Sequence, residues 1–123
     1  MGRIEKINRQ IKKEVGSIIQ WDLGDPRLQF VTITAVDVSK DLHHAKVSFS
    51  VLGDASQRQA AQMGLDRAKG MIRRLLGERI DIRYTPALFF VYDKTVEMSA
   101  RIERTLKEIH HEHESDHTHP KEE

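Results

Sequence analysis

Cationic side chains recur in two segments of this 123-residue chain, residues 3–21 and residues 57–77. Lysine and arginine side chains contact the phosphate oxygens of nucleic acids, and backbone N–H groups at a helix junction add to such contacts. The alternative interpretation is a solvated helix face without a ligand. We take the following as candidate RNA-binding residues: Arg3, Lys6, Arg9, Lys12, Lys13, Arg67, Lys69, Gly70, Arg73 and Arg74.

Carboxylates offer a second candidate chemistry, because they can bind a metal ion or act as a general acid or base. Four of them are expected near the same strand ends: Asp22, Asp25, Asp37 and Asp41. The simpler interpretation is turn chemistry, in which Asp25 opens an Asp-Pro turn and Asp41 caps a hairpin. The sequence contains no phosphate-binding loop, dinucleotide fingerprint or zinc-protease motif. We therefore predict no catalytic residue, no metal site and no enzymatic activity.

Histidines gather at the C-terminal end, in residues 110–123. They are His110, His111, His113, His117 and His119. Imidazoles spaced two to four residues apart can chelate zinc or nickel transiently. A structural metal site also needs fixed ligands, and this polar stretch has no apolar period, so we predict a disordered tail. A metal-buffering tail remains an alternative, whereas His43 and His44 are predicted to be surface residues of a hairpin.

The composition indicates one small domain in a reducing compartment. Cysteine is absent, which excludes disulfides and thiolate chemistry. No apolar run approaches the roughly 20 residues of a membrane span, and Met1 leads directly into a charged stretch instead of a signal peptide. We therefore expect a cytoplasmic protein. The formal net charge is +1, but the tail holds five acidic residues and one basic residue. The rest of the chain thus carries 19 basic and 14 acidic residues, which favours a polyanionic partner.

Hydrophobic periodicity predicts the elements that position these side chains. Residues 3–21 are predicted to form an amphipathic helix that ends at Gly24-Asp25-Pro26. Its apolar face is Ile4, Ile7, Ile11, Val15 and Ile18. Residues 29–39 predict a strand whose apolar register shifts between Ile33 and Val36, either at a bulge or where the strand twists, and residues 45–51 predict its hairpin partner.

The second half of the chain predicts further helices and a third strand. Residues 57–77 read as helical with Ser56 as the N-cap, and Gly64 and Gly70 predict a bend between two shorter helices. Residues 79–92 predict a strand, and residues 94–110 predict a last helix. The order α-β-β-α-α-β-α indicates the α+β class, with a three-stranded sheet and helices on one face.

Aromatic residues bear on which form of nucleic acid is recognised. They mostly occupy positions compatible with a core: Trp21, Phe30, Phe49, Tyr84, Phe89, Phe90 and Tyr92. Aromatic platforms of the RRM kind, which stack on unpaired bases, are not evident. We therefore expect recognition of folded RNA through its backbone and shape.

Several segments, in their joint order and spacing, resemble the ribosome-binding factor A family of bacteria. The first are Asp25-Pro26-Arg27-Leu28, Val31-Thr32-Ile33, Val36-Asp37-Val38-Ser39-Lys40-Asp41-Leu42 and Ala45-Lys46-Val47. They continue with Ala68-Lys69-Gly70, Ile72-Arg73, Arg83-Tyr84-Thr85-Pro86 and Phe90-Val91-Tyr92-Asp93. The resemblance covers about residues 3–109 and implies a KH-like RNA-binding domain over residues 1–109, with a separate tail at 110–123.

The resemblance implies a type II KH fold, with the order α-β-β-α-α-β and one appended helix. It also implies that an alanine-x-glycine kink, here Ala68-Lys69-Gly70, replaces the GxxG loop of KH modules. The expected partners are the small (30S) ribosomal subunit and its 16S rRNA during late maturation. The family role includes processing of the 5′ end of that RNA and growth at low temperature, without catalysis or a cofactor.

The sequence thus predicts a non-enzymatic assembly factor, monomeric when free and not membrane-bound, that contacts RNA through its first helix and the kinked helix pair. The alternative function is a protein-interaction adaptor that recruits a partner by strand addition at an exposed sheet edge. Salt dependence separates the two, because phosphate contacts weaken steeply with salt.

Overall fold

The computed structural model describes residues 2–95 of the chain. The predicted last helix, apart from Lys94 and Thr95, and the predicted tail lie outside the described residues. Of the described residues, 2–93 belong to one compact unit. Within residues 2–95, no helix is both long and apolar enough to cross a bilayer.

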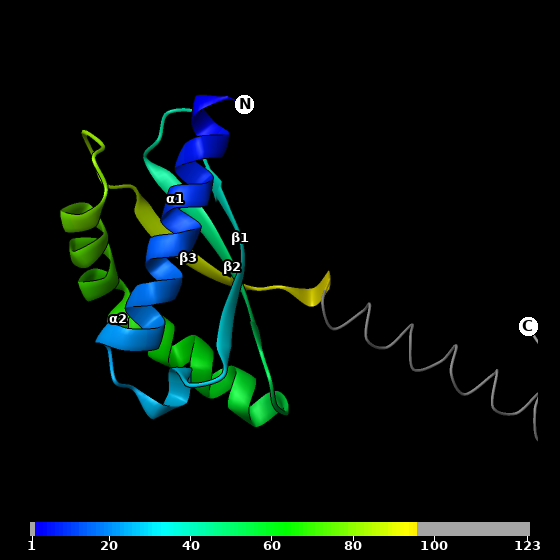
Figure 1. Cartoon of the computed structure of the whole chain (residues 1–123). Helices are drawn as coiled ribbons and strands as arrows, with labels where there is room; N and C mark the ends of the chain where they lie inside the picture. Colours follow the sequence, from blue (N-terminus) through cyan, green and yellow to red (C-terminus); the bar gives the residue numbers. More distant parts are fainter. Residues whose placement is uncertain (1, 96–123) are drawn as a thin grey trace, which may run out of the picture. The chain divides into compact units, whose positions relative to one another are not determined.

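A three-stranded mixed sheet forms the centre of this unit (Figure 1). Strand β1 (Val31–Val38) pairs antiparallel with β2 (His44–Val51), and β2 pairs parallel with β3 (Ala87–Tyr92). A parallel pair needs a crossover, which helix α2 (Ala55–Arg79) supplies. Helix α1 (Arg3–Ser17) and α2 cover the same face of the sheet, so the predicted α+β class is confirmed.

The apolar stripe of α1 forms one wall of the core. Ile7, Ile11 and Val15 are buried, as the spacing predicts, and a π-helical turn, η1 (Ile18–Asp22), continues the helix. A π turn holds an extra residue, so the adjacent Ile18 and Ile19 are both buried. The π turn ends at Asp22, and Gly24 just beyond it has a φ of +64°, which is unfavourable for other residues.

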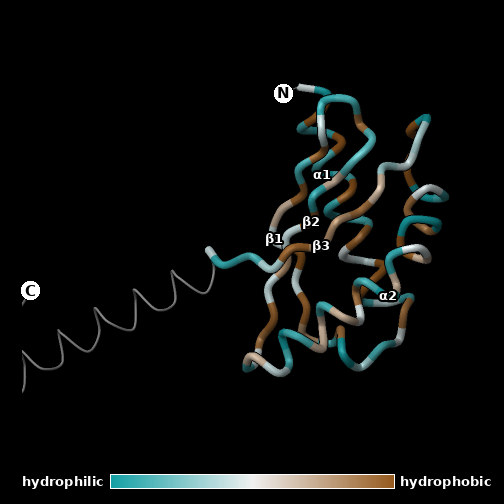
Figure 2. Tube along the Cα trace, turned by 180° about the vertical axis from the view of Figure 1, so that it is seen from behind, coloured by the Kyte–Doolittle hydropathy of each residue, from teal (hydrophilic) through white to brown (hydrophobic). Residues whose placement is uncertain are grey.

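The strands supply the facing wall through alternating burial. Ala45, Val47 and Phe49 of β2 are fully buried, and the residues between them face away from the helices. Figure 2 shows hydrophobic residues recurring along α1 and the strands, whereas the β1–β2 turn is largely hydrophilic. One sheet face is therefore packed and the other is open.

The register shift predicted in β1 is confirmed, and it occurs at a bulge. The register between β1 and β2 shifts between Ile33 and Ala35, which leaves Thr34 without an opposite residue. The Thr34 hydroxyl donates a hydrogen bond of 2.6 Å to the carboxylate of Asp93, just beyond β3. The bulge thus restores the alternation of buried side chains and ties both outer strands together.

Helix α2 differs from the prediction in two respects. It is one helix of 25 residues instead of two shorter helices, although Figure 1 shows that it changes direction part-way along. The glycines therefore bend the helix without ending its hydrogen bonding. The N-cap is Asp54, not Ser56: the Asp54 carboxylate accepts from the Gln57 N–H, and the Gln57 side chain accepts from the Asp54 N–H.

The third strand is shorter than predicted, because β3 begins at Ala87. Ala87 pairs with His44, the first residue of β2, so residues 80–86 lie opposite the β1–β2 turn and have no strand to pair with. Pro86 also lacks the N–H that a ladder needs. The alternating Ile80, Ile82 and Tyr84 therefore belong to an irregular segment.

Candidate nucleic-acid interface

The basic residues of α1 are all exposed: Arg3, Lys6, Arg9, Lys12 and Lys13. Three of them, Arg9, Lys12 and Lys13, line an open hollow of about 400 Å³ between α1 and the outer edge of β1. Within residues 2–95, neither Lys12 nor Lys13 has an ion-pair partner. A phosphate group entering this hollow could therefore bind these lysines without first breaking an ion pair to a carboxylate.

On α2, Lys69 and Arg73 are one turn apart and face β3. The Lys69 ammonium lies 5.8 Å from the centre of the Phe89 ring on that strand. The Arg73 guanidinium donates hydrogen bonds to the backbone carbonyls of Thr85 and Pro86, with Nη2 2.7 Å from the Thr85 oxygen. Arg73 thus holds the segment that leads into β3, and it is a positioning residue whatever else it contacts.

Arg67 and Arg74 lie on a neighbouring face of α2. The Arg74 guanidinium is 3.1 Å from the Glu78 carboxylate one turn later, which is a surface ion pair of small energetic value. The charge of Arg67 acts on Asp25, and it is one of the causes that lower the pKa of that carboxyl. The basic residues of α2 therefore have different neighbours and do not form a single cluster of unpaired cations.

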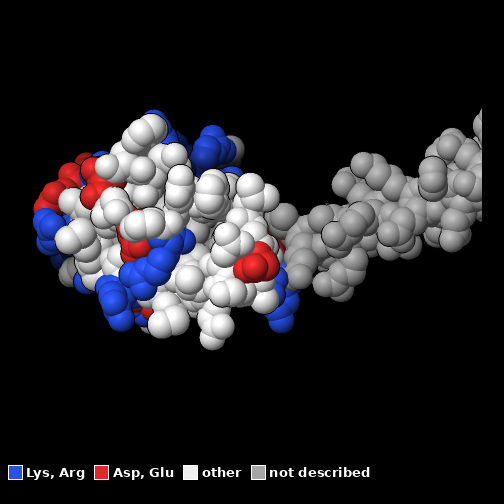
Figure 3. Space-filling view, turned by 90° about the horizontal axis from the view of Figure 1, so that it is seen from below, with Lys and Arg blue, Asp and Glu red and all other residues white. Residues whose placement is uncertain are grey.

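The structure places Arg9, Lys12 and Lys13 of α1 at the opposite edge of the sheet from Lys69 and Arg73 of α2. The α1 hollow borders β1, whereas Lys69 and Arg73 contact β3, and β2 lies between these strands. Viewed from below, Lys and Arg side chains are spread around the molecule beside Asp and Glu (Figure 3). An RNA that touched both groups would have to span this width.

Gly70 is exposed on α2, and a Cβ atom built there would have no neighbouring atom within 4 Å. Crowding against the sheet therefore does not explain this glycine. Gly64 differs, because its Cβ would lie 3.1 Å from Leu28, and its absence allows the segment before β1 to approach α2. Of these two glycines of α2, Gly70 is the one that leaves open space beside its backbone, as a phosphate contact requires.

Asp25 and Asp41 make turns, as predicted, whereas Asp22 pairs with Arg79 and Asp37 lies within β1. Asp25 accepts hydrogen bonds from the backbone N–H and the guanidinium of Arg27, which together lower the pKa of its carboxyl. Asp41 accepts from the Ser39 hydroxyl and the His43 N–H, and these bonds lower its pKa in the same way. Within the described part of the chain, no three acidic or histidine side chains are arranged to hold a metal ion.

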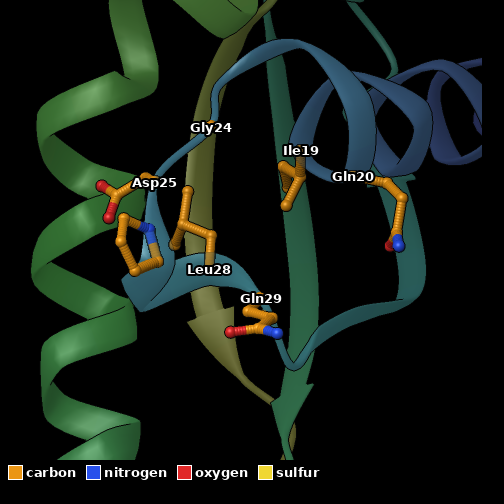
Figure 4. A pocket seen from close by; sticks show the side chains of 7 residues that line it. Ile19, Gln20, Gly24, Asp25, Leu28 and Gln29 are labelled. Carbon is orange, nitrogen blue, oxygen red and sulfur yellow. The ribbon is translucent and has the colours of Figure 1, made fainter.

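A further hollow of about 250 Å³ lies beneath the loop that joins α1 to the 3-10 turn η2 (Pro26–Leu28) (Figure 4). Ile19 and Leu28 form apolar walls, and Gln20 and Gln29 contribute amides. Figure 4 shows the Asp25 side chain turned toward α2. Its carboxylate pairs with Arg27 of η2. The hollow thus offers apolar walls and amides, but the carboxylate at its rim is already paired.

The prediction that the aromatic residues belong to the core is wrong for four of them. Trp21 is 78% exposed, Tyr84 61%, Phe30 51% and Phe89 47%. Phe89 stands between the buried Leu88 and Phe90, and alternation along a strand forces the middle of three such residues outward. The spacing therefore contained this signal. The exposure of Tyr84 could not be predicted from the spacing, because it follows from the absence of strand pairing before Ala87 in the structure.

Known proteins share this arrangement of residues and elements. The ribosome-binding factor A family model matches residues 3–106. The chain belongs to this family. A ribosome-binding factor A of Halothermothrix orenii is 45% identical over 114 residues, which is 93% of each chain.

Solved structures of the ribosome-binding factor A family share the fold. A crystal structure of the factor from Thermus thermophilus is 29% identical with a TM-score of 0.67, covering 75% of this chain and 97% of that one. A homology model of the Thermus thermophilus factor, fitted into the cryo-EM map of a 30S–RbfA complex, is 30% identical with a TM-score of 0.60. It covers 71% of this chain and 91% of that one.

Proposed function

We propose that this chain is a non-enzymatic assembly factor that binds the small ribosomal subunit through its 16S rRNA. Family membership and the 30S complex of a family member support the subunit as partner. The observation that carries the RNA contact is the α1 hollow, where Lys12 and Lys13 have no ion-pair partner among residues 2–95. The other proposed contacts are Arg3, Lys6, Arg9, Arg67, Lys69, Gly70, Arg73 and Arg74.

Such a factor acts by binding alone. A protein that binds one local conformation of a folding RNA more tightly shifts the population toward it. We place this action in late maturation, including processing of the 5′ end of 16S rRNA and growth at low temperature. The proposal puts the protein in the cytoplasm, where bacterial subunits assemble, as a monomer when free.

The test is titration of Lys12→Ala and Lys13→Ala against isolated small subunits across a range of salt. Each phosphate contact that is lost should lower the slope of log affinity against log salt by about one. Gln10→Ala is the matched control, because Gln10 is exposed on the same helix and carries no charge. Arg73→Ala is less informative, since it also releases the carbonyls that Arg73 holds.

Unchanged slopes in both lysine variants would remove the α1 hollow from the interface. Subunit binding that does not depend on salt would instead favour the adaptor function, in which a sheet edge pairs with a partner strand. The predicted tail, residues 110–123, is proposed to be dispensable for the RNA contact.

A further inference from the structure

At one end of the sheet, the β1–β2 turn lies beside the N-terminus of α1 (Figure 1). Together with residues 80–86, these segments enclose a hollow of about 150 Å³. Its walls are apolar and include Ile7, Val38, Leu42 and Ile82. Its rim is polar and includes Arg3, His43, Arg83 and Tyr84. The hollow is separate from the lysines that carry the proposed subunit contact.

Tyr84 is the exposed aromatic residue of this rim. The His43 ring meets it edge-on, with 6.4 Å between the ring centres. The Arg83 guanidinium lies 5.4 Å from the centre of the Tyr84 ring. Aromatic rings and guanidinium planes are the surfaces on which unpaired bases stack in RNA-binding proteins.

The backbone that presents Tyr84 is fixed from both sides. Arg73 of α2 donates hydrogen bonds to the carbonyls of Thr85 and Pro86, and the Pro86 side chain is fully buried. The Ala87 N–H donates to the His43 carbonyl at 2.9 Å, which couples this segment to the β1–β2 turn. A backbone held in this way loses little conformational freedom when a ligand binds the side chain that it presents.

Leu42, in the wall of the hollow, has an unusual backbone conformation. Its φ is +65°, in the left-handed region that leucine rarely adopts. The turn holds it there, because the Leu42 N–H donates to the Ser39 carbonyl at 2.9 Å. Strain of this kind is concentrated at binding sites, where it fixes the position of a side chain.

The charges of the rim decide which ligand fits. Arg3 and Arg83 carry positive charge, and the one carboxylate of the rim, Asp41, already accepts bonds from the Ser39 hydroxyl and the His43 N–H. His43 Nδ1 lies 3.8 Å from the second Asp41 oxygen. An apolar peptide side chain would fill the hollow but leave both arginines without a counter-charge, whereas a nucleotide supplies an apolar face and a phosphate together.

We infer that this hollow binds one unpaired RNA nucleotide, with its base stacked on Tyr84 and its phosphate held by Arg83 and Arg3. The inference rests on the proposed function, since it adds a single-stranded contact to a protein that binds ribosomal RNA. It also revises the expectation that recognition depends on folded RNA alone. Arg73 acts here as a positioning residue.

The test is titration of the full chain with an unpaired, single-stranded oligo(A) hexanucleotide, with the NMR signals of the Tyr84 and His43 rings as the readout. Both rings should shift, and Tyr84→Leu should weaken the affinity about tenfold, the effect of losing one stacked base. Tyr84→Phe should keep the affinity. Trp21→Leu is the matched control, because it removes another exposed ring near the opposite end of the first helical segment.

Thermal melts of Tyr84→Leu and Trp21→Leu check that both variants fold, as expected for exposed side chains. Equal affinity of Tyr84→Leu and the wild type would overturn the inference. The inference would also be overturned if inorganic phosphate shifted the NMR signals of the two rings as far as the oligonucleotide does. The site would then bind only an anion.

Failure of this inference is distinguishable from failure of the proposed function. Lys12→Ala combined with Lys13→Ala should weaken subunit binding and leave the oligonucleotide shifts at Tyr84 intact. If the wild-type protein binds subunits but the oligonucleotide does not shift the NMR signal of the Tyr84 ring, only the nucleotide site is contradicted. Wild-type protein that shows the ring shifts but does not bind subunits supports the site and contradicts the proposed function.

Discussion

At the scale of single residues, Asp25 and Arg27 make the segment between α1 and β1 sensitive to pH. Hydrogen bonds from Arg27 lower the pKa of the Asp25 carboxyl below its ordinary value of 3.8. The unfolded chain therefore binds this proton more readily than the folded chain. The pair stabilises the fold above about pH 4, and this contribution is lost as pH falls through the lowered pKa.

Asp25→Asn should remove this pH dependence. We expect the free energy of unfolding of the wild type to fall more between pH 7 and pH 3 than that of the variant. Asparagine keeps an oxygen that accepts from the Arg27 N–H, so the turn should persist. Urea unfolding at the two pH values measures the difference, and equal losses in both proteins would mean that the pair contributes nothing.

Gly70 allows a second prediction at this scale. A Cβ there meets no other atom, so Gly70→Ala should gain about 0.5–1 kcal/mol of stability from helix propensity alone. It should nevertheless weaken binding to small subunits, since the methyl group hinders close approach of phosphate to the backbone. Melting temperature and subunit affinity measured on one preparation decide the matter. A stabilised variant with full affinity would remove Gly70 from the interface.

At the scale of elements, the start of α2 depends on its capping box. Asp54→Ala should cost about 1 kcal/mol, because the Gln57 N–H loses its acceptor at the helix end. Ser56→Ala is the matched control, since Ser56 lies inside the first turn and should be neutral within a few tenths of a kcal/mol. Urea unfolding measures both variants, and equal costs would contradict the assigned cap.

Contacts with two neighbouring segments hold the bent helix α2 in place. Gly64 allows the 3-10 turn before β1 to approach the helix, and Arg73 fixes the segment after it. The helix is therefore attached along its length to the segments that precede β1 and β3. Contacts of this kind explain how a long helix with three glycines, Gly64, Gly70 and Gly77, keeps a single bent shape.

At the scale of the whole molecule, charge distribution governs the encounter with RNA. Deleting residues 111–123 removes five acidic residues and one basic residue, which changes the formal net charge from +1 to +5. The truncated chain should fold as stably as the full chain and bind subunits equally well or slightly more tightly at low salt. Thermal melts and salt titrations with subunits measure this.

A truncated chain that melts well below the full chain, in the absence of metal, would make the predicted tail a structural element. If a chelator produced the same loss in the full chain, the metal-buffering alternative would return. The test also separates the domain of residues 1–109 from the tail, a division that stays a prediction.

Much of the fold followed from local pattern. The period of Ile7, Ile11 and Val15 determined α1 and its buried face, and alternation determined β1, β2 and the bulge at Thr34. These features were predictable because each depends only on which side chains of a single helix or strand are buried away from water. The basic residues of α1 were likewise predictably exposed, since they occupy the surface opposite the apolar stripe.

The tertiary structure decided what depends on distant partners. Residues 80–86 alternate like a strand, but the parallel register with β2 leaves them unpaired, so Tyr84 becomes exposed beside His43. Lys12 and Lys13 of α1 lie at the opposite edge of the sheet from Lys69 and Arg73 of α2, because each helix borders a different outer strand. Arg73 holds backbone carbonyls 12 and 13 residues away in sequence. Sequence periodicity carries no information on such long-range pairing, which only the packing of helix, turn and strand brings about.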